Sequence, residues 1–509
     1  MTPPRGHPQE RGDPAQPYVS VSETHSGAVF FAGDRAFKLK KPVSLGFLDF
    51  STLEARRRAC EREVELNRRL APDVYLDTAA LMGSDGTASE HFVVMRRLPS
   101  DRRLSALVEA GASVDEELRG LARLLAAFHA RAERSAAVDE WARRDAVLGR
   151  WERNAVEMEG LPGGVFQPGA VERVLFLARR YLAGRETLFA GRLEAGRACD
   201  GHGDLLTEDI FCLEDGPRVL DCIDFDDRLR YGDVLYDVAF LAMDLERLGR
   251  PDLSRRFLDL YREFTGDSWP ASLAHHYVAY RAQVRALVAA IRLVQAGGGS
   301  PEPARHLLGL SSAHLELGRV RLVLVGGIPG TGKSTLAAQL AEALGATAIR
   351  SDEVRKQLMG IDPITPQRAS SDDGIYRPEI TEATYAELAR LAGVCLSNGL
   401  SAVVDATFSD RRWRDEMRDL AAGAAADLAE LRCVAPLHVI ETRIADRLAR
   451  GGDASDATPA VARRFAQEEA PWPTSATIDT SATVEAARDA ALERLGVPRT
   501  VTFASPPSG

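Results

Sequence analysis

The segment GGIPGTGKST, residues 326–335, constrains this chain more than any other feature. The apolar run RLVLVGG leads into it and a helical pattern follows from Ser334, which is the strand–loop–helix context of a P-loop. There, backbone N–H groups and the helix N-terminus hold phosphate oxygens, Lys333 reaches the β- and γ-phosphates, and Ser334 can hold magnesium. The complete match excludes a turn that serves packing alone. The predicted nucleotide-binding residues are Gly327, Gly330, Thr331, Gly332, Lys333, Ser334 and Thr335.

Apolar strands alternate with helical segments from residue 319 onward, as in RLVLVGG, ATAIRS, LSAVVDATF and LRCVAP. This alternation predicts an α/β P-loop domain with a parallel sheet over residues 319–498. Asp405 ends the strand LSAVVD, where a carboxylate can face a metal or orient a substrate; capping of the following turn is the alternative. Asp352 and Arg355 begin the helix after ATAIR and could take an acceptor proton and clamp an anion. The alternative for that pair is an N-cap beside an exposed arginine.

The preceding part of the chain divides into a β-rich and a helical region. At 509 residues the chain is too long for one typical core, so two or three domains are expected. Residues 18–98 contain the short strands AVFFAG, RAFKLK and HFVVM and one amphipathic helix, and residues 99–318 are mostly helical. AGGGSPEP, residues 296–303, is a flexible break. Residues 1–17 and 499–509 are expected to be disordered tails.

Two acidic positions in CDGHGDLLTEDIFCLEDGPRVLDCIDFDD have the order and spacing of a kinase active site. Asp204 follows His-Gly and would accept the proton of an acceptor hydroxyl. Asp209 stands where the D-x-x-x-x-N spacing of a catalytic loop places a metal ligand, and Asp224 follows a short strand, where a kinase keeps its principal magnesium ligand. A β-hairpin with solvated acids is the alternative.

The small β-rich region contains candidates for the lysine and glutamate of a kinase. Ala36-Phe37-Lys38 has the A-x-K form that places a lysine on the α- and β-phosphates, and Glu63 suits its helix partner. Lys40 and Glu61 are open alternatives, as is a solvated run of charge in KLKK.

Residues 319–495 resemble the AAA-type P-loop kinases close to polynucleotide 5′-kinases, zeta-toxin-like kinases and gluconate kinases. The resemblance is carried by GGIPGTGKST, SDEVRK and VVDATFSDRRWR. It implies that Asp352 activates the acceptor and that Arg355 binds it. ETRIADRLARGGDASDAT looks like the lid of that family, in which Arg447 and Arg450 would close on the transferring phosphate; exposed helix charge is the alternative.

The first part resembles the aminoglycoside phosphotransferase family, through HGDLLTEDI and YGDVLYDVAF. Asp233 and Asp237 match structural acidic positions of that family, whereas Asp209 departs from it, because the family has asparagine there. His129 is expected to be a packed helix histidine. Nearly the whole chain resembles proteins described as bifunctional aminoglycoside phosphotransferase/ATP-binding proteins. The implied fold is multidomain: a bilobal α+β protein-kinase-like domain followed by an α/β P-loop domain.

Charge, hydropathy and cysteine usage narrow the partners. A formal net charge of -10 disfavours long nucleic acids, and no apolar run approaches the length of a membrane span. The six cysteines form no C-x-x-C pair, which disfavours a zinc site or disulfide framework and fits a cytoplasmic location.

The leading hypothesis is an ATP- and Mg²⁺-dependent enzyme with two sites, each of which transfers a γ-phosphoryl group to a hydroxyl of a small molecule. The main alternative makes the first domain a pseudokinase, which binds a nucleotide or metabolite and regulates the P-loop domain. A third hypothesis is an ATP-driven switch without an acceptor. No motif defines the acceptors or the oligomeric state.

Overall fold

The structure, a computed structural model, describes residues 19–23, 27–45, 48–362, 377–450, 458, 460, 462–463, 465 and 470–496. The two predicted tails, 1–17 and 499–509, lie outside the described residues. The chain forms two compact units. The first comprises Met1–Ala142 and Ala195–Ser268, and the second comprises Arg143–Glu194 and Trp269–Gly509.

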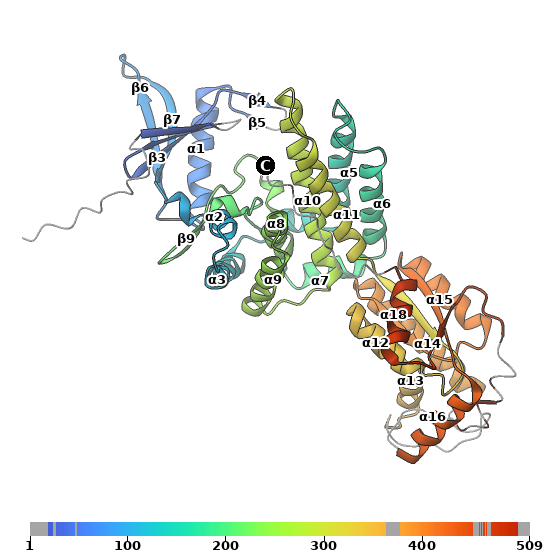
Figure 1. Cartoon of the computed structure of the whole chain (residues 1–509). Coiled ribbons are helices and arrows are strands. Elements are labelled where there is room, and N and C mark those ends of the chain that lie inside the picture. The colour runs from blue at the N-terminus through green and yellow to red at the C-terminus, as the bar shows by residue number, and fades with distance from the viewer. Residues whose placement is uncertain are drawn as a thin grey trace, which may run out of the picture. The chain divides into compact units, whose positions relative to one another are not determined.

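The first unit contains a five-stranded antiparallel sheet with the order β1-β2-β3-β7-β6 (Figure 1). The predicted strands AVFFAG, RAFKLK and HFVVM are confirmed in β2, β3 and β7. β1 and β6 were not predicted; β6 is an edge strand rich in Ala, Leu and Met, residues without a strong strand preference, and much of it is exposed. The strands are β1 Val19–Glu23, β2 Gly27–Ala32, β3 Arg35–Lys40, β6 Tyr75–Met82 and β7 Ala88–Arg96, with the short pair β4 Ser44–Leu45 and β5 Leu48–Asp49.

Helix α1, Leu53–Asn67, packs on this sheet. The hydroxyl of Thr52 caps its start by accepting from the Ala55 N–H, which satisfies one of the N–H groups that a helix end leaves unpaired. Cys60 and Val64 on the inner face of α1 join Val93 of β7 in one apolar cluster. This packing points Glu63, also buried, toward β3.

The rest of the first unit is mainly helical and surrounds two short strand pairs. The β9–β10 hairpin and the β8–β11 pair flank the segment that contains Asp204. The elements are η1 Ser100–Arg102, α2 Leu104–Glu109, α3 Asp115–Arg131, α4 Ala136–Ala142, β8 Ala198–Asp200, η2 Thr207–Asp209, β9 Ile210–Leu213, β10 Gly216–Val219, η3 Asp227–Leu229, β11 Tyr231–Asp233, α8 Val234–Arg247 and α9 Pro251–Thr265.

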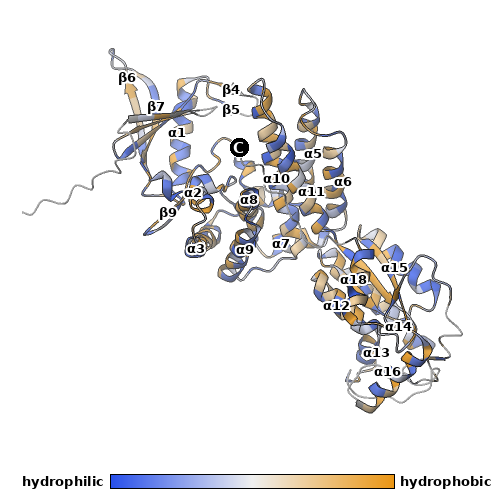
Figure 2. Cartoon of the chain, in the orientation of Figure 1, coloured by the Kyte–Doolittle hydropathy of each residue, from blue (hydrophilic) through white to orange (hydrophobic). Residues whose placement is uncertain are grey.

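The second unit contains a five-stranded parallel sheet with the order β13-β14-β12-β15-β16. The strands β12 and β14 are buried throughout, and Figure 2 shows hydrophobic colour among the strands between the helices of this part. The parallel sheet confirms the predicted α/β domain, and β16 adds a strand that was not predicted. The elements are β12 Arg321–Gly326, α12 Lys333–Leu344, β13 Thr347–Arg350, α13 Ser351–Leu358, α14 Pro378–Ser397, β14 Ala402–Asp405, α15 Arg411–Gly423, β15 Asp427–Val434, α16 Leu437–Arg450, β16 Ala476–Asp479 and α18 Val484–Arg494.

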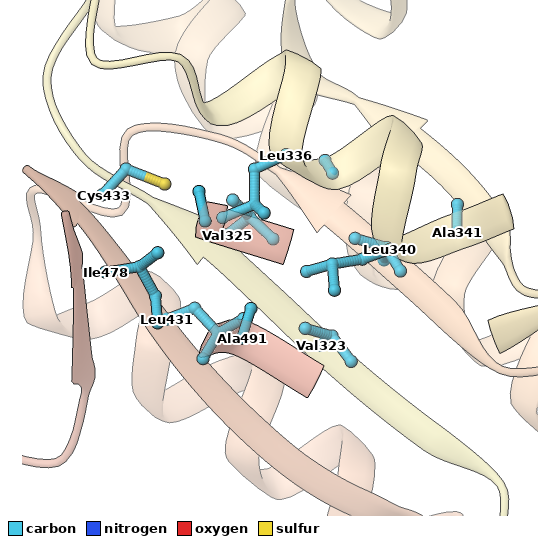
Figure 3. Packing of buried hydrophobic residues seen from close by; sticks show 12 residues of the cluster. Val323, Val325, Leu336, Leu340, Ala341, Leu431, Cys433, Ile478 and Ala491 are labelled. Atoms are coloured by element: carbon cyan, nitrogen blue, oxygen red, sulfur yellow. The ribbon is translucent and has the colours of Figure 1, made fainter. Parts of the chain in front are cut away.

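One apolar cluster joins this sheet to the helix that follows the P-loop (Figure 3). Val323 and Val325 of β12 lie opposite Leu336 and Leu340 of α12. Apolar residues at spacing four place both leucines on the same face of the helix, so burial of that face anchors the start of α12 next to the end of β12.

Five helices that the sequence analysis assigned to the region 99–318 belong to the second unit rather than the first. They are α5 Arg144–Gly160, α6 Ala170–Ala183, α7 Glu186–Glu194, α10 Ala271–Gln295 and α11 Glu302–Leu317. Arg180 of α6 donates to Asp427 at the start of β15 over 2.6 Å, and Ser272 of α10 donates to the carbonyl of Gly399 over 2.7 Å. The division of compact units therefore differs from a cut at residue 318, because α6 and α10 contact the loops at the amino ends of the parallel strands.

Within the described ranges, no helix combines the length and the hydropathy needed to cross a lipid bilayer.

Candidate functional site

The P-loop turns where only glycine fits. Gly327, Gly330 and Gly332 have φ values of 132°, 85° and 85°, which side-chain-bearing residues rarely adopt. A Cβ on Gly330 would lie 2.7 Å from Cγ2 of Ile440, so the loop also leaves no room for one. Thr331 is buried and its Oγ1 donates to the carbonyl of Ile328 over 2.8 Å, which closes the turn.

A polar cavity of about 400 Å³ lies over this loop. Its lining includes the predicted P-loop residues Gly330, Gly332, Lys333, Ser334 and Thr335, and also Asp352 and Arg447 from outside the loop. Parallel strands bring their carboxyl ends to one edge of the sheet, and α13 and α18 follow the two outer strands, β13 and β16. The cavity therefore extends along this edge, from Asp352 at one side to Val484 at the other.

Asp405 lies beside the start of α12. It is buried, it accepts a hydrogen bond from Ser334, and Arg350 approaches its Oδ2 to 3.7 Å. Burial raises the pKa of Asp405 above its ordinary value, and Lys333 and the Ser334 hydrogen bond act in the opposite direction. These contacts favour the predicted metal-facing or substrate-orienting role over a turn cap.

Asp352 and Arg355 form an ion pair at the edge of the cavity. Nη1 of Arg355 lies 3.4 Å from Oδ1 of Asp352, and Arg355 is buried. The N-cap of α13 is Arg350, so Asp352 is not the capping residue. Both observations argue against the alternative of an N-cap beside an exposed arginine.

Helix α16, which contains the predicted lid residues, has a further arginine at the cavity that the sequence analysis missed. Arg443 lines the cavity with Arg447, one helical turn away on the same face. Its Nη2 donates to the carbonyl of Thr480 over 2.7 Å, and Nη1 lies 3.5 Å from where a Cβ on Gly332 would be. The i, i+4 spacing with Arg447 in ETRIADRLAR was the available signal. The side chain of the other predicted lid residue, Arg450, lies outside the described residues.

Thr480 was also missed, because the strand that positions it was not predicted. It follows β16, lines the cavity and donates its Oγ1 hydrogen to the carbonyl of Thr331 over 2.5 Å. Thr480 thereby joins the far edge of the sheet to the P-loop.

In the first unit, Glu63 holds both candidate lysines. Its Oε1 lies 2.8 Å from Nζ of Lys38, and its Oε2 lies 2.6 Å from Nζ of Lys40. The two lysines are two residues apart on β3, so they share one face of the sheet. Glu61 instead pairs with Arg57 on the exposed side of α1, which excludes Glu61 as the partner in this structure. The solvated-run alternative is also excluded for Lys38 and Lys40, because both are mostly buried.

The segment that contains Asp204 is held by a buried carboxylate. Asp237 of α8 accepts hydrogen bonds from the backbone N–H groups of His202 and Gly203, each over 2.8 Å. Nε2 of His129 lies 3.0 Å from the same carboxylate, so the predicted packed histidine is buried and hydrogen-bonded. These bonds shape the turn immediately before Asp204. Asp233, the other predicted structural acid, caps α8 by accepting from the Leu235 N–H over 2.8 Å.

His202 serves structure in this turn. It is fully buried, and burial lowers its pKa to about 4. Its Nε2 lies 3.1 Å from the carbonyl of Leu220, and the Asp204 N–H donates to its Nδ1 over 3.3 Å. A neutral imidazole with its proton on Nε2 satisfies both bonds.

The remaining carboxylates form two groups. Oδ2 of Asp224 accepts from Lys40 over 2.6 Å, beside Glu63. Asp209 lies in the field of Asp221 and Asp204, and burial together with these negative charges raises its pKa well above its usual range. Asp221, which the sequence analysis did not single out, accepts from Lys38 over 2.5 Å. The signal for it was a second acid in LDCID.

The donor sets fit magnesium, although the described residues contain no group of three His, Cys, Asp or Glu side chains arranged for a metal. Mg²⁺ at phosphate sites takes one or two protein oxygens and completes its shell with phosphate and water. Asp209 and Asp224 in the first unit, and Ser334 in the second, offer hard oxygen ligands of this kind. Lys38 offsets only part of the negative charge around Asp209, and a bound cation would offset more of it.

Comparison with known families divides the chain into two matched regions. Residues 47–275 match the family model described as "Phosphotransferase enzyme family", and residues 322–471 match that of an "AAA domain". Both regions agree with the predicted order of a kinase-like fold followed by a P-loop fold.

Relatives that share both regions occur in mycobacteria. Proteins described as uncharacterized in Mycobacterium tuberculosis and Mycobacterium bovis are 44% identical over 470 residues, which is 92% of this chain and 93% of each relative. Among solved structures, a gluconokinase from Sinorhizobium meliloti covers 35% of this chain and 93% of its own length, at 18% identity and a TM-score of 0.26. A choline/ethanolamine kinase family protein from Mesorhizobium loti covers 59% of this chain and 89% of its own length, at 14% identity and a TM-score of 0.37.

Proposed function

We propose that this chain is an ATP- and Mg²⁺-dependent phosphotransferase with two sites. The premise is that the chain belongs to the family in which an aminoglycoside phosphotransferase-like domain is fused to an AAA-type P-loop kinase domain. Each site transfers the γ-phosphoryl group of ATP to a hydroxyl of a small molecule. The observation that carries the proposal is the cavity over the P-loop, because Lys333, Asp352 and Arg447 line it together.

In the P-loop site, different parts of the cavity lining would contact the phosphates and the base of the nucleotide. The loop N–H groups and Lys333 hold the β- and γ-phosphates, and Val484 and Ala487 provide a less polar wall for the base at the β16 side. Arg443 and Arg447 of α16 lie over the phosphates and offset the charge that spreads over the γ-phosphoryl oxygens during transfer.

Asp352 performs the acid–base step in this site. Its carboxylate accepts the proton of the acceptor hydroxyl as the oxygen bonds to the γ-phosphorus and the bond to the β,γ-bridging oxygen breaks. Arg355 holds the carboxylate of Asp352 in place from a buried position. Ser334 and Asp405 are placed to hold Mg²⁺, which neutralises phosphate charge when bound.

In the first unit, Asp204 has the corresponding role as base. The hydrogen bonds that Asp237 accepts from the turn before Asp204 support this role, since they hold its backbone in place. Lys38 would bind the α- and β-phosphates, and its ion pair with Glu63 supports this role. Asp209 and Asp224 would hold Mg²⁺ on the same side.

The test is a screen of cell metabolites by mass spectrometry for species that gain one phosphate with ATP and the full-length protein. Lys333→Ala, Asp204→Ala and the double variant assign each product to a site. Full activity in the double variant would reject both sites.

A second candidate function is a pseudokinase in the first unit that binds nucleotide and regulates the P-loop site. The additional carboxylate of Asp209 favours it, since that charge opposes a bound phosphate unless a cation intervenes. Loss of all products in Lys333→Ala, with a changed P-loop rate in Asp204→Ala, would support this function over two active sites.

A further inference from the structure

The carboxylate of Asp221 occupies a backbone position that disfavours most side chains. Asp221 has a φ of 63°, one of three positive values among non-glycine residues in the described part of the chain. Glycine adopts such angles without strain, whereas a residue with a side chain does so at some cost. The Asp221 N–H donates to the hydroxyl of Tyr75 over 3.2 Å, which helps to hold this conformation. The unfavourable backbone angle of Asp221 therefore occurs together with a hydrogen bond that helps to hold its backbone, and so its carboxylate, in one position.

The two lysine–aspartate pairs at this site differ in exposure. The side chains of Lys40 and Asp224 are 7% and 11% exposed, whereas those of Lys38 and Asp221 are 19% and 52% exposed. Glu63, which is fully buried, contacts both lysines. The side chain of Lys38 is the more exposed of the two lysines, and a ligand from solvent that approaches it also meets Asp221.

Lys38 lowers the pKa of Asp221, so the pair favours the ionised carboxylate, but an ion pair of this exposure adds little net stability. Pairs with a half-exposed partner contribute little to stability, because solvent screens the attraction and ordering the side chains costs entropy. Here the backbone strain acts in the same unfavourable direction. Asp221 also adds negative charge beside Asp209, and Asp204 contributes to the same field. These costs are explained if the carboxylate acts on a ligand of Lys38.

We propose that Asp221 is a further nucleotide-site residue of the first unit, which makes Lys38 accept a phosphate only together with a divalent cation. Asp221 neutralises Lys38, so a phosphate oxygen that approaches Lys38 also approaches the carboxylates of Asp221 and Asp209. A free nucleoside triphosphate is repelled there, whereas a cation between phosphate and carboxylates turns the repulsion into attraction. The site thereby selects the cation-bound form of the nucleotide. This inference rests on the proposed nucleotide binding by the first unit.

The test measures the dissociation constant of ATP by calorimetry, once with excess Mg²⁺ and once with a chelator. Full-length protein with Lys333→Ala provides the background, because that change weakens phosphate binding at the P-loop. Asp221→Asn keeps the size of the side chain and a residue type that tolerates positive φ, but it removes the charge. We expect ATP without Mg²⁺ to bind more tightly to Asp221→Asn, so that the ratio of the two dissociation constants falls by about tenfold or more.

The matched control is Asp215→Asn, which removes the same charge from the same segment. Asp215 is mostly exposed and pairs with Arg218 over 2.8 Å. We expect the ratio of the Lys333→Ala background to be unchanged in this control. If thermal unfolding shows that Asp221→Asn is not folded, Asp221→Gly removes the carboxylate and suits the backbone angle.

The possible outcomes separate the two levels of the proposal. A ratio for Asp221→Asn within twofold of the background would overturn the role of Asp221 and leave nucleotide binding by the first unit intact. No ATP binding to the background protein in either condition would overturn that proposed function, and the role of Asp221 with it.

Discussion

At the scale of single residues, the carboxylates of the two candidate sites differ in the charges around them. Asp405 and Asp352 of the P-loop site have cationic neighbours, Lys333 and Arg355. Asp209 of the first unit lies instead among other acids, and Lys38 offsets only part of their charge. The first unit should therefore depend more strongly on a bound cation or on pH.

Asp209→Asn should stabilise the protein at neutral pH in the absence of magnesium. The folded state raises the pKa of Asp209, so its contribution to stability is present below the unfolded carboxyl pKa of about 4 and is lost as pH rises through the folded value. Asparagine removes that loss, and we expect the free energy of unfolding of the first unit to rise by about 1–2 kcal/mol at pH 7. Thermal and urea unfolding between pH 3.5 and 8 would measure it.

The gain should disappear near pH 4 and shrink when Mg²⁺ and ATP are added, since a bound cation also relieves the repulsion. Phosphotransfer by this site should persist or improve in the same variant. A constant difference at all pH values would mean that Asp209 is not the source of the strain.

Asp352→Asn should slow transfer in the P-loop site far more than it weakens ATP binding. An amide cannot take the acceptor proton, but it has nearly the same shape, and the loop that holds the phosphates is unchanged. We expect kcat to fall by about a hundredfold or more while the Kd for ATP changes by less than about threefold. Single-turnover kinetics with nucleotide titration would measure both, and equal losses would instead indicate a structural role.

At the scale of elements, each site depends on one turn whose shape comes from packing. The P-loop turn is shaped by α16, since Ile440 and Ile444 fill the space beside Gly330. The turn before Asp204 is shaped by α8, through Asp237. Substitutions in α16 or α8 should therefore change the activity of the corresponding site, although the substituted residue contacts no substrate.

Gly330→Ala should abolish nucleotide binding at the P-loop while the protein stays folded. The added Cβ would lie 2.7 Å from Ile440, and the φ of 85° would be strained, so the loop must move. Gly309→Ala is the control, because Gly309 lies in α11 and a Cβ there meets no atom within 4 Å. Binding of a fluorescent nucleotide, measured in a Lys38→Ala background that weakens phosphate binding by the first unit, should fall at least about tenfold for Gly330→Ala only.

Asp237→Asn should impair the first site much more than Asp233→Asn. An amide in place of the Asp237 carboxylate loses an acceptor for one of two buried N–H groups, which costs about 1–3 kcal/mol and loosens the turn before Asp204. Asparagine at position 233 still caps α8, since Asn and Asp are equally good caps. Thermal unfolding and product formation by the first site, measured in a Lys333→Ala background, would compare the two.

At the scale of the whole molecule, the two matched families do not coincide with the two compact units. Residues 143–194 lie within the phosphotransferase match but cluster with the P-loop sheet. Arg185 of α7's leading turn donates to the carbonyl of Ala424, and Arg180 and Arg319 both contact Asp427. Residues of the phosphotransferase match therefore contribute contacts that stabilise the P-loop domain.

A fragment of residues 319–509 should consequently be less stable than the same segment in the full chain. Removing α6, α7 and α10 exposes the loops that they cover and leaves Asp427 without Arg180. We expect the melting temperature of the fragment to be lower by about 2–8 °C, the shift that a loss of roughly 1–2 kcal/mol produces in a domain of this size. Differential scanning calorimetry with and without ATP would test this, and an equal melting temperature would show that the P-loop domain is independent.

The sequence alone determined the features whose chemistry needs neighbouring residues. These features are local patterns: the glycines of the P-loop, Lys333, and the spacing from Asp204 to Asp224. In each case a single turn with its adjoining strand holds the functional side chains. Glu63 and Asp352 were also predicted, because each follows from the period of a helix or the end of a strand. Asp209 was recognised as a departure because the family that the first part resembles has asparagine at that position.

Only the tertiary structure decided which distant residues complete these sites. Arg443 and Thr480 reach the P-loop from α16 and β16, and Asp221 meets Lys38 across 183 positions of sequence. Contacts of this kind depend on how elements pack and not on the spacing within one element, so no periodicity reports them. The same holds for the helices that join the P-loop unit, because burial against a partner surface, and not any local signal, assigned them to it.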